Sequence, residues 1–575
     1  MTFLKILLAI VIILLIVFVV WFVRYRKCGK CPICAIQKTF IPTKVTINTE
    51  GEDNYANNAQ KTPIMGWSSW NTFRQNITED LVLETATAMK NSGLLEAGYE
   101  YINLDDCWQS SMRDSNGNWQ GDVERFSSGI PALINKVNSM GMKVGLYSSN
   151  GTLTCEDLPA SLGREAEDAK TLATWGAEFF KYDFCHHNVI KGDTPVIEGL
   201  EINVKGQPKA MTLMAEDARL EGKARIIDVK ALPSGKGIGM LNHGAGRATF
   251  SFETNFSGVC YLTILTHKVI THHEQYLQVI VNGELSEVFF PKTRASSPTG
   301  RTQISIKLHA GENTIVLQNP IKTFADSSYT QYSRMGRELQ KAVKNAASEF
   351  GTGEKPIVYS ICEWGNSFPW KWGPKAGNMW RTTPDIMPKW YSVNGIYRHN
   401  IKLYESASPG HWNDPDMLEV GVGDFTEEEN KTHFSLWCMM AAPLVLGNDI
   451  RKFVGADGEP LNNSILKIVT NEELIAIDQD KLVKQAKIVA RSRKIDVIAR
   501  PLANGDIAVC FYNRGGAKGF SYDINEIASD EYLNFNADAS TYTIRDLWSG
   551  ENFSSKTISA TLEKHACKVY RILKV

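Results

Sequence analysis

The sequence predicts an α/β protein built on a (β/α)8 (TIM) barrel, which is interrupted by an inserted β-sandwich and followed by a C-terminal antiparallel β-sandwich. Three observations predict this fold. From residue 62 onward, short apolar runs alternate with amphipathic segments, which is typical of strand–helix units around a parallel sheet. The stretch 195–324 lacks helical faces and alternates like strands between turns. The tail 481–575 is strand-like as well.

Eight apolar runs are predicted to form the barrel strands. They are residues 65–70, 99–106, 143–148, 178–183, 356–362, 380–386, 411–417 and 443–449. Helix signals lie between several of them: Thr78 can cap a helix that ends before Gly93, and Pro131 opens another that ends at Gly141. A third helical face, 332–350, closes at Gly351. Eight strand–helix units favour a closed eight-stranded barrel.

The interruption and the tail complete the predicted division of the chain. Strands are expected at 249–252, 261–265, 276–281, 302–308 and 314–317 of the insert, separated by turns such as Asn282-Gly283. The predicted domains are an anchor or uncleaved signal 1–27, a linker 28–61, the barrel 62–194 and 325–480, the inserted module 195–324 and the C-terminal sandwich 481–575.

The amino terminus predicts a membrane span. Residues 6–23 are 18 consecutive apolar residues between Lys5 and Arg24, long enough to cross a bilayer and longer than most signal-peptide cores. Basic residues after the span favour a cytoplasmic location for the remaining chain, in conflict with the site described below. The sequence leaves three roles open for the thiols that follow the span: metal binding, acylation or none. These thiols are Cys28, Cys31 and Cys34.

Composition excludes some classes of function. Lys and Arg number 62 against 63 Asp and Glu, for a net charge of −1, so nucleic-acid binding, which needs a basic excess, is not expected. There is no Walker loop, no Gly-x-Ser-x-Gly elbow and no His-Glu-x-x-His helix. Three consecutive residues, Cys185-His186-His187, cannot all face one metal ion and predict a turn. No metal site is expected in the barrel.

Acidic residues gather where predicted strands end. They are Asp105, Asp106, Asp183, Glu363, Asp385, Asp414 and Asp416. One such residue often caps the next helix, but five strand ends that carry acids point to an active site, because the C-terminal ends of barrel strands meet at one mouth. Cations and aromatic rings accompany them: Trp67, Trp70, Tyr147, Lys181, Trp364, Arg381 and Trp412. Carboxylates with flat aromatic rings suit a polyhydroxylated sugar.

The same segments resemble glycoside hydrolase family 27, the α-galactosidases or melibiases. The resemblance rests on motifs at 66–71, 101–108, 181–185, 362–365, 380–386 and 412–418. It implies hydrolysis of terminal α-D-galactosides with retention of configuration and no cofactor for catalysis. Asp183 matches the nucleophile and Asp385 the acid/base, and retaining chemistry needs their carboxyl groups roughly 5–5.5 Å apart. Lys181, on the same strand face as Asp183, can help to keep it ionised.

The resemblance also implies a sugar-binding set and a disulfide. The binding set is Trp70, Asp105, Asp106, Tyr147, Lys181, Glu363, Trp364, Arg381 and Asp416. Cys155 and Cys185 match a disulfide beside the nucleophile, whereas Cys107 is expected to be free. A disulfide needs an oxidising compartment, so the catalytic part is expected outside the cytoplasm, either membrane-anchored or secreted.

Several alternatives stay open at this stage. The retained Asp pair and Glu363 favour galactose over β-L-arabinopyranose and N-acetylgalactosamine, and dextran-type substrates, transglycosylation or sugar binding without catalysis are the other readings. The insert resembles a family 35-type carbohydrate-binding module, which implies a possible structural calcium bound through Glu216. The sequence does not indicate the oligomeric state.

Overall fold

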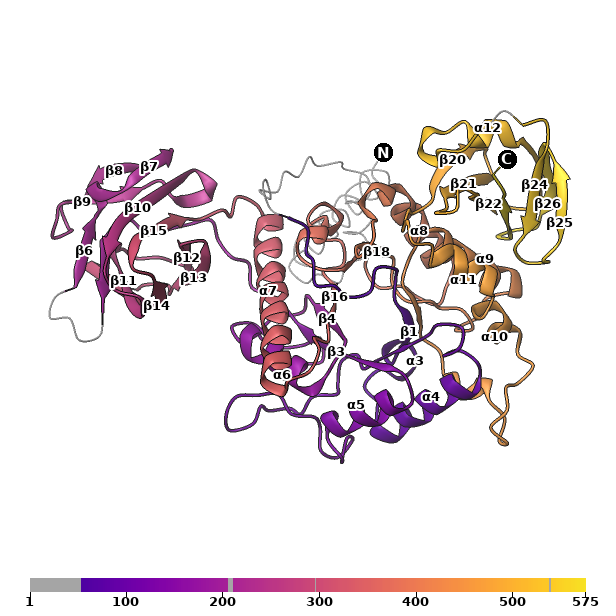
Figure 1. Ribbon diagram of the computed structural model, residues 1–575, viewed down its shortest axis with the longest axis horizontal. Coiled ribbons are helices and arrows are strands. Elements are labelled where there is room, and N and C mark those ends of the chain that lie inside the picture. Colours follow the sequence, from indigo (N-terminus) through magenta and orange to yellow (C-terminus); the bar gives the residue numbers. More distant parts are fainter. Residues whose placement is uncertain (1–52, 205–209, 295, 537–538, 575) are drawn as a thin grey trace, which may run out of the picture. The chain divides into compact units, whose positions relative to one another are not determined.

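The computed structural model describes residues 53–204, 210–294, 296–536 and 539–574. Two compact units divide them (Figure 1). One unit holds Asp53–His187 together with the residues from Ser333 onward, and it contains the barrel and the C-terminal domain. The other unit is Asn188–Tyr332. The predicted span at 6–23 and the thiols of Cys28, Cys31 and Cys34 lie outside the described residues.

The barrel is an eight-stranded sheet in which every pair of neighbours is parallel. Its strands, in sheet order, are β18 (Trp412–Asp414), β17 (Met379–Arg381), β16 (Val358–Ile361), β4 (Phe179–Asp183), β3 (Lys143–Ser149), β2 (Tyr101–Asn103), β1 (Met65–Ser68) and β19 (Leu444–Leu446). A parallel bridge between Leu418 and Leu446 joins the two edges. The (β/α)8 prediction is confirmed.

Helices surround these strands (Figure 1). They are α3 (Trp70–Phe73), α4 (Glu79–Asn91), α5 (Ile130–Ser139), α6 (Glu165–Trp175), α7 (Phe324–Phe350), α8 (Trp390–Asn400), α9 (Glu427–Met439), α10 (Ser464–Val469) and α11 (Glu472–Asp478). Thr78 caps α4 as predicted, because its hydroxyl accepts the N–H of Leu81 at 3.2 Å. Helix α7 begins eight residues before the predicted 332, where Asp326 accepts the N–H of Thr323 at 2.8 Å.

A nearly buried carboxylate on α4 ties this helix to the segment before α5. Glu79 accepts the N–H and the hydroxyl of Ser128 at 2.9 and 2.6 Å and pairs with Lys136 at 2.9 Å. Burial tends to raise the pKa of Glu79, but these hydrogen bonds outweigh it and bring the pKa from the usual 4.5 to about 2. The native state therefore favours ionised Glu79, which stabilises it above pH 4.5 and loses this effect as pH falls toward 2.

We expect Glu79→Gln to lower the free energy of unfolding at pH 7 by about 2–3 kcal/mol, since one unit of pKa corresponds to about 1.4 kcal/mol. Denaturant unfolding at pH 7 and at pH 3.5 checks this, and the gap between variant and wild type should narrow at the lower pH. Glu84→Gln, on the exposed face of the same helix and paired with Arg451, is the control and should change stability by less than about 1 kcal/mol. An equal loss in both variants would contradict the assignment.

The second unit is a sandwich of two antiparallel sheets around one apolar core. One sheet contains β13 (Glu284–Phe290), β12 (Gln275–Val281), β15 (Gly311–Gln318), β10 (Gly246–Thr254) and β7 (Arg219–Gly222). The other contains β14 (Ser297–Leu308), β11 (Gly258–Lys268), β5 (Ile197–Asn203), β9 (Lys236–Gly239) and β8 (Arg225–Asp228), with β6 (Met211–Met214) beside β5. Glu216 is paired with Lys236. Among the described residues, no group of three His, Cys, Asp or Glu is arranged to hold a metal ion. The calcium site suggested for the insert therefore stays a prediction.

The C-terminal domain is also an antiparallel β structure with its own core. Its larger sheet contains β20 (Lys487–Arg491), β21 (Ile495–Pro501), β22 (Ile507–Asn513), β27 (Cys567–Ile572), β24 (Tyr542–Asp546) and β25 (Asn552–Ser555). A second sheet pairs β23 (Lys518–Asp523) with β26 (Thr557–Leu562), and the short helix α12 (Ile524–Ala528) follows β23.

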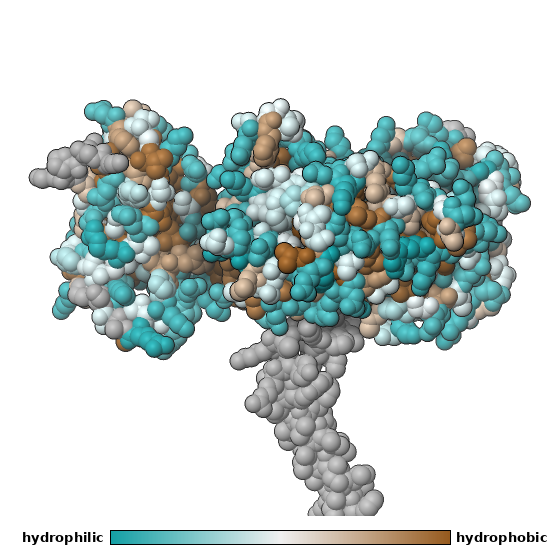
Figure 2. Space-filling view, turned by 90° about the horizontal axis from the view of Figure 1, so that it is seen from below, coloured by the Kyte–Doolittle hydropathy of each residue, from teal (hydrophilic) through white to brown (hydrophobic). Residues whose placement is uncertain are grey.

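The surface seen in Figure 2 is mainly hydrophilic, with apolar residues in small separate groups. Within the described part of the chain, no helix combines the length and the apolar character that crossing a membrane requires.

Candidate active site

The register of the barrel brings the predicted acids to one rim. Tyr182 on β4 and Trp380 on β17 both pair with Ile361 on β16, so the next residues, Asp183 and Arg381, reach the same level. Arg381 in turn pairs with Asp414 on β18. Residues from three separate strands thus meet at the C-terminal end of the barrel, where the sequence placed the site.

Asp183 is the enclosed carboxyl group of the rim, with 5% of its surface exposed. Its Oδ2 accepts the hydroxyl of Tyr147 at 3.0 Å, and its Oδ1 accepts the N–H of Phe184 at 2.8 Å. Burial raises the pKa of Asp183, the charge of Lys181 lowers it and the charge of Asp385 raises it again, so that the net shift is upward. Lys181 therefore favours the ionised form, as expected, but does not outweigh burial.

Lys181 contacts a different acid directly. Its Nζ lies 2.7 Å from Oδ2 of Asp105 and 5.2 Å from the centre of the Tyr147 ring. Asp106 is buried beside Asp105 and accepts the N–H groups of Cys107 and Glu156 at 2.8 and 3.0 Å. Burial raises the pKa of Asp106 to about 7. The Asp pair and Lys181 form one cluster across β2 and β4.

Arg381 organises the opposite side of the mouth. Its Nη2 lies 2.7 Å from Oδ2 of Asp416 and 3.1 Å from Oδ1 of Asp385. Asp416 has a φ of 83°, a strained backbone for a residue other than glycine, and its carboxylate is fixed by the N–H groups of Ile386 and Met417 at 2.7 and 2.8 Å. The loop that carries Asp385 is thereby held to the end of β18.

Asp385 differs from Asp183 in its surroundings, because 74% of its side chain is exposed. Desolvation by the surrounding walls of the mouth tends to raise the pKa of Asp385, but the charges of Arg381 and Lys181 outweigh this and lower it. The two carboxyl groups act on one another electrostatically, since the charge of Asp385 is among the causes that raise the pKa of Asp183. One acid is enclosed and the other open to water.

The remaining predicted residues also lie at the strand ends. Glu363 is fully buried and accepts the N–H of Ser367 at 2.8 Å. Trp364 is half-buried, has a φ of 58° and packs edge-on against Phe184, with ring centres 5.8 Å apart. Trp70 is half-buried at the start of α3, with the guanidinium of Arg74 5.4 Å from its ring centre. The rim thus offers Trp70 and Trp364, whereas Trp67 and Trp412, also expected at the site, are fully buried in the core.

A cavity of about 40 Å³ lies inside the barrel. Its polar lining includes Ser68, Asn103, Asp105, Lys181, Arg381, Asp414 and Asp416. This volume accommodates a water molecule but not a pyranose ring.

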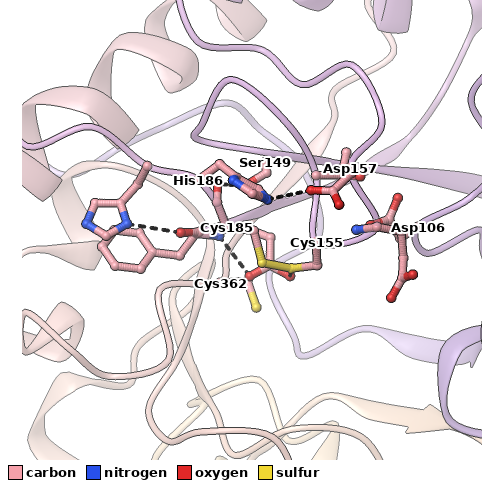
Figure 3. The surroundings of a disulfide bond; sticks show 12 residues. Asp106, Ser149, Cys155, Asp157, Cys185, His186 and Cys362 are labelled. Atoms are coloured by element: carbon pink, nitrogen blue, oxygen red, sulfur yellow. Dashed lines mark hydrogen bonds and ion pairs between the residues drawn. A yellow bond between two sulfur atoms is a disulfide. The ribbon is translucent and has the colours of Figure 1, made fainter. Parts of the chain in front are cut away.

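The predicted disulfide is present at the mouth (Figure 3). Cys155 and Cys185 are joined, and the hydroxyl of Tyr147 lies 3.3 Å from the Cys155 sulfur. The next residue, His186, has a φ of 51° and pairs with Asp157 at 2.9 Å, so the predicted turn at 185–187 is confirmed. Cys107 is a buried free thiol, also as predicted.

Sequence reasoning missed two groups that shape the rim. The N–H of Phe184 binds Asp183, and the hydroxyl of Ser69 accepts the N–H of Asp105 at 3.0 Å. Backbone donors leave no signal in residue type. Ser69 lies inside the 66–71 motif, which was the available signal.

Comparison with known proteins identifies the barrel and the last domain. A family model described as "Alpha galactosidase A" matches residues 62–206 and 322–480. The chain belongs to this family, the α-galactosidases of glycoside hydrolase family 27. A second model, for the C-terminal β-sandwich of α-galactosidases, matches residues 492–572.

Individual α-galactosidases are similar over most of the chain. "Alpha-galactosidase 2" of Arabidopsis thaliana is 31% identical over 513 residues, covering 89% of both chains. "Alpha-galactosidase" of Cyamopsis tetragonoloba is 32% identical over 517 residues, covering 89% of this chain and 87% of its own. The crystal structure of α-galactosidase I from Mortierella vinacea has a TM-score of 0.61 at 24% identity, covering 90% of this chain and 98% of its own.

Proposed function

We propose that this protein hydrolyses terminal α-D-galactosides with retention of configuration, with Asp183 as nucleophile and Asp385 as acid/base. The observation that carries the proposal is the pair of unlike carboxyl groups at one barrel mouth. Asp183 is enclosed and oriented by two hydrogen bonds. Asp385 is exposed to the solvent, on the side to which a leaving group can depart. Family membership supports the same reaction.

The first step forms a glycosyl-enzyme. The carboxylate of Asp183 attacks the anomeric carbon, and the bond from that carbon to the glycosidic oxygen breaks. Asp385 gives its proton to this oxygen, so the leaving group departs as a neutral alcohol. The hydroxyl of Tyr147 and the N–H of Phe184 keep Asp183 in one orientation, which favours attack from a fixed direction.

The second step releases the sugar. Asp385, now ionised, removes a proton from water as the water oxygen attacks the anomeric carbon. The ester bond to Asp183 breaks, and galactose leaves with the configuration it had in the substrate. Arg381, 3.1 Å from Asp385, stabilises the ionised form that acts as base.

The proton must lie on Asp385 when substrate is bound, and substrate binding supplies a reason. In the free protein Asp385 is exposed and its pKa is low, whereas burial raises the pKa of Asp183. A sugar that covers the mouth removes water from Asp385, which raises its pKa. Formation of the ester then removes the negative charge of Asp183, which lowers the pKa of Asp385 again and suits it to act as base.

Galactose is the sugar that the binding set favours. Asp105 and Asp106 stand together as acceptors for two hydroxyl groups, and Lys181 holds Asp105 in place. Glu363 occupies the position that relatives acting on N-acetylgalactosamine fill with small residues. The proposed binding set is Trp70, Asp105, Asp106, Tyr147, Lys181, Glu363, Trp364, Arg381 and Asp416. It favours terminal α-D-galactose over β-L-arabinopyranose, N-acetylgalactosamine and glucose.

Purified protein incubated with aryl α-D-galactoside tests the function. We expect release of the aryl alcohol, with α-galactose as the first anomer seen by NMR. Aryl β-L-arabinopyranoside, aryl α-N-acetylgalactosaminide and dextran should react far more slowly. If the β anomer forms first, the retaining mechanism is contradicted. Faster turnover of another sugar would contradict the assigned specificity.

The pH profile tests the electrostatic part of the proposal. The charge of Lys181 lowers the pKa of both Asp183 and Asp385, so Lys181→Met should raise both. We therefore expect the profile of kcat/KM against pH, which reports the pair in the free enzyme, to move to higher pH. Lys143→Met, at the first residue of β3 and paired with Glu100, should leave the profile in place. A profile that stays or moves to lower pH in Lys181→Met would contradict this account.

We also propose that the catalytic unit works outside the cytoplasm. The disulfide beside Asp183 supports this, because such bonds persist in oxidising compartments. Anchoring through residues 6–23 stays a prediction. The full chain and a variant that lacks residues 1–27 are each expressed, and the membrane fraction is separated from the medium. If residues 6–23 are an anchor, only the full chain should be found in the membrane fraction.

A further inference from the structure

Helix α3 carries Trp70 but is too short to hold itself in place. It has four residues, one turn, and an isolated helix of this length is not stable in water. The position of the Trp70 ring therefore depends on contacts that fix this turn to the barrel.

Two tethers of α3 come from neighbouring strands. Before the helix, the N–H of Ser69 binds the carbonyl of Asn103, at the end of β2, at 3.1 Å. Within the helix, the hydroxyl of Thr72 binds the carbonyl of Gly447, just after β19, at 2.6 Å. These contacts hold the two ends of the turn. Asn71 lies between them.

The third tether is a side chain from the far edge of the sheet. Glu419 lies directly after the 412–418 motif that contains β18. Its Oε1 accepts a hydrogen bond from the side-chain amide of Asn71, the residue next to Trp70. The backbone N–H of Glu419 donates to Nε2 of His433 at 3.0 Å. Glu419 thus connects the segment after β18 with the turn after β1.

This carboxyl group is costly to bury. Glu419 is 1% exposed, and its Oε2 has no hydrogen-bond partner among the described residues. Burial and the charge of Asp416 raise its pKa to about 7. A half-satisfied buried carboxyl group contributes less to stability than an apolar side chain of similar size. Stability alone therefore gives no reason for an acid at this position.

We propose that Glu419 is a positioning residue for sugar binding: its bond to Asn71 fixes α3 and thereby the plane of the Trp70 ring. The inference rests on the proposed function, in which Trp70 belongs to the galactose-binding set. Without this bond the contacts at its two ends keep α3 attached, but the turn loses the side-chain contact that is next to Trp70 in the chain. Glu419 itself does not touch the sugar.

Binding of galactose, the reaction product, tests the inference without depending on turnover. Glu419→Leu removes the hydrogen bond and keeps a comparable volume, whereas Glu419→Gln keeps an acceptor for Asn71. Calorimetry should give a galactose Kd about tenfold weaker in Glu419→Leu, the equivalent of one hydrogen bond, and within about twofold of wild type in Glu419→Gln. The melting temperature of Glu419→Leu should equal or exceed that of wild type.

Glu429→Leu is the matched control. Glu429 caps α9 through Thr426 and pairs with His565, so its loss should lower the melting temperature and leave the galactose Kd unchanged. If Glu419→Leu does not fold, Asn71→Ala removes the same bond from the other side and should weaken galactose binding by the same factor.

Two outcomes would overturn the positioning role. One is a wild-type Kd in Glu419→Leu or, where that variant does not fold, in Asn71→Ala. The other is a parallel loss of binding and stability in Glu419→Leu and Glu419→Gln alike. A wild-type protein that binds no galactose overturns the proposed function instead, and with it the reason for an anchored Trp70. A wild type that binds galactose but shows no turnover affects the proposed function alone.

Discussion

Asp183→Asn should abolish turnover of aryl α-galactosides, with kcat reduced by at least about 10⁴-fold, as expected when a covalent nucleophile is removed. Asparagine keeps the shape of the side chain and can still accept the hydroxyl of Tyr147, but its amide oxygen does not form a stable ester with the sugar. Initial rates with substrate in excess, measured on protein shown to be free of wild-type contamination, check this.

Folding and binding should survive this substitution. Burial raises the pKa of Asp183, which means that the folded state disfavours the ionised form, so a neutral amide should leave the melting temperature equal or higher. Galactose should still bind, since the residues proposed to contact it are unchanged. Asp157→Asn, an exposed acid paired with His186 near the same disulfide, is the control and should retain wild-type kcat. Substantial turnover by Asp183→Asn would require another nucleophile.

Sequence patterns could predict where the acids meet because parallel strands end at one rim. Asp105 follows β2, and Asp183 and Asp414 end β4 and β18, so the register of the sheet brings them together. The eight runs also gave the barrel, although β2, β17, β18 and β19 are only three residues long. The apolar runs in the sequence are longer than the strands, because each run also includes residues of the ordered loops next to the strand.

The character of each acid could not be predicted in this way. Whether Asp183 is enclosed and Asp385 exposed depends on contacts between distant segments, such as Asp416 binding the N–H of Ile386. Lys181 was expected to act on Asp183, two residues away, yet it pairs directly with Asp105, which follows β2 on the other side of β3. Such partners are set by packing across the mouth, which strand periodicity does not encode.

The link between Asn71 and Glu419 is the clearest case of this kind. The two residues are 348 positions apart, and each lies at the edge of a different motif. Residue type alone gave Glu419 no role, because an acid after a barrel strand is as consistent with a helix cap as with a site. Only closure of the barrel, which brings the segment after β18 next to β1 and β19, shows its partner.

Replacing Asp385 should produce a loss that depends on the leaving group. With Asp385→Ala, hydrolysis of a galactosyl oligosaccharide should fall by about 10²–10⁴-fold, because its alcohol needs a proton to depart. An activated substrate such as 2,4-dinitrophenyl α-galactoside needs no acid, so formation of the glycosyl-enzyme should be little affected and its breakdown should become rate-limiting.

Added azide separates the two roles proposed for Asp385. Azide attacks the glycosyl-enzyme without a general base, so it should restore turnover of the activated substrate by Asp385→Ala and yield α-galactosyl azide, whose configuration NMR can assign. The same addition should not restore hydrolysis of the oligosaccharide, since the missing proton donor limits the first step.

Asp416→Asn is the comparison. Asp385→Ala also removes a partner of Arg381, and Asp416→Asn alters the other partner, whose carboxylate lies 2.7 Å from the Arg381 guanidinium. Rescue by azide in Asp385→Ala but not in Asp416→Asn would assign the acid/base role to Asp385, whereas equal rescue, or none, would show that the exposed carboxyl group is not the proton donor.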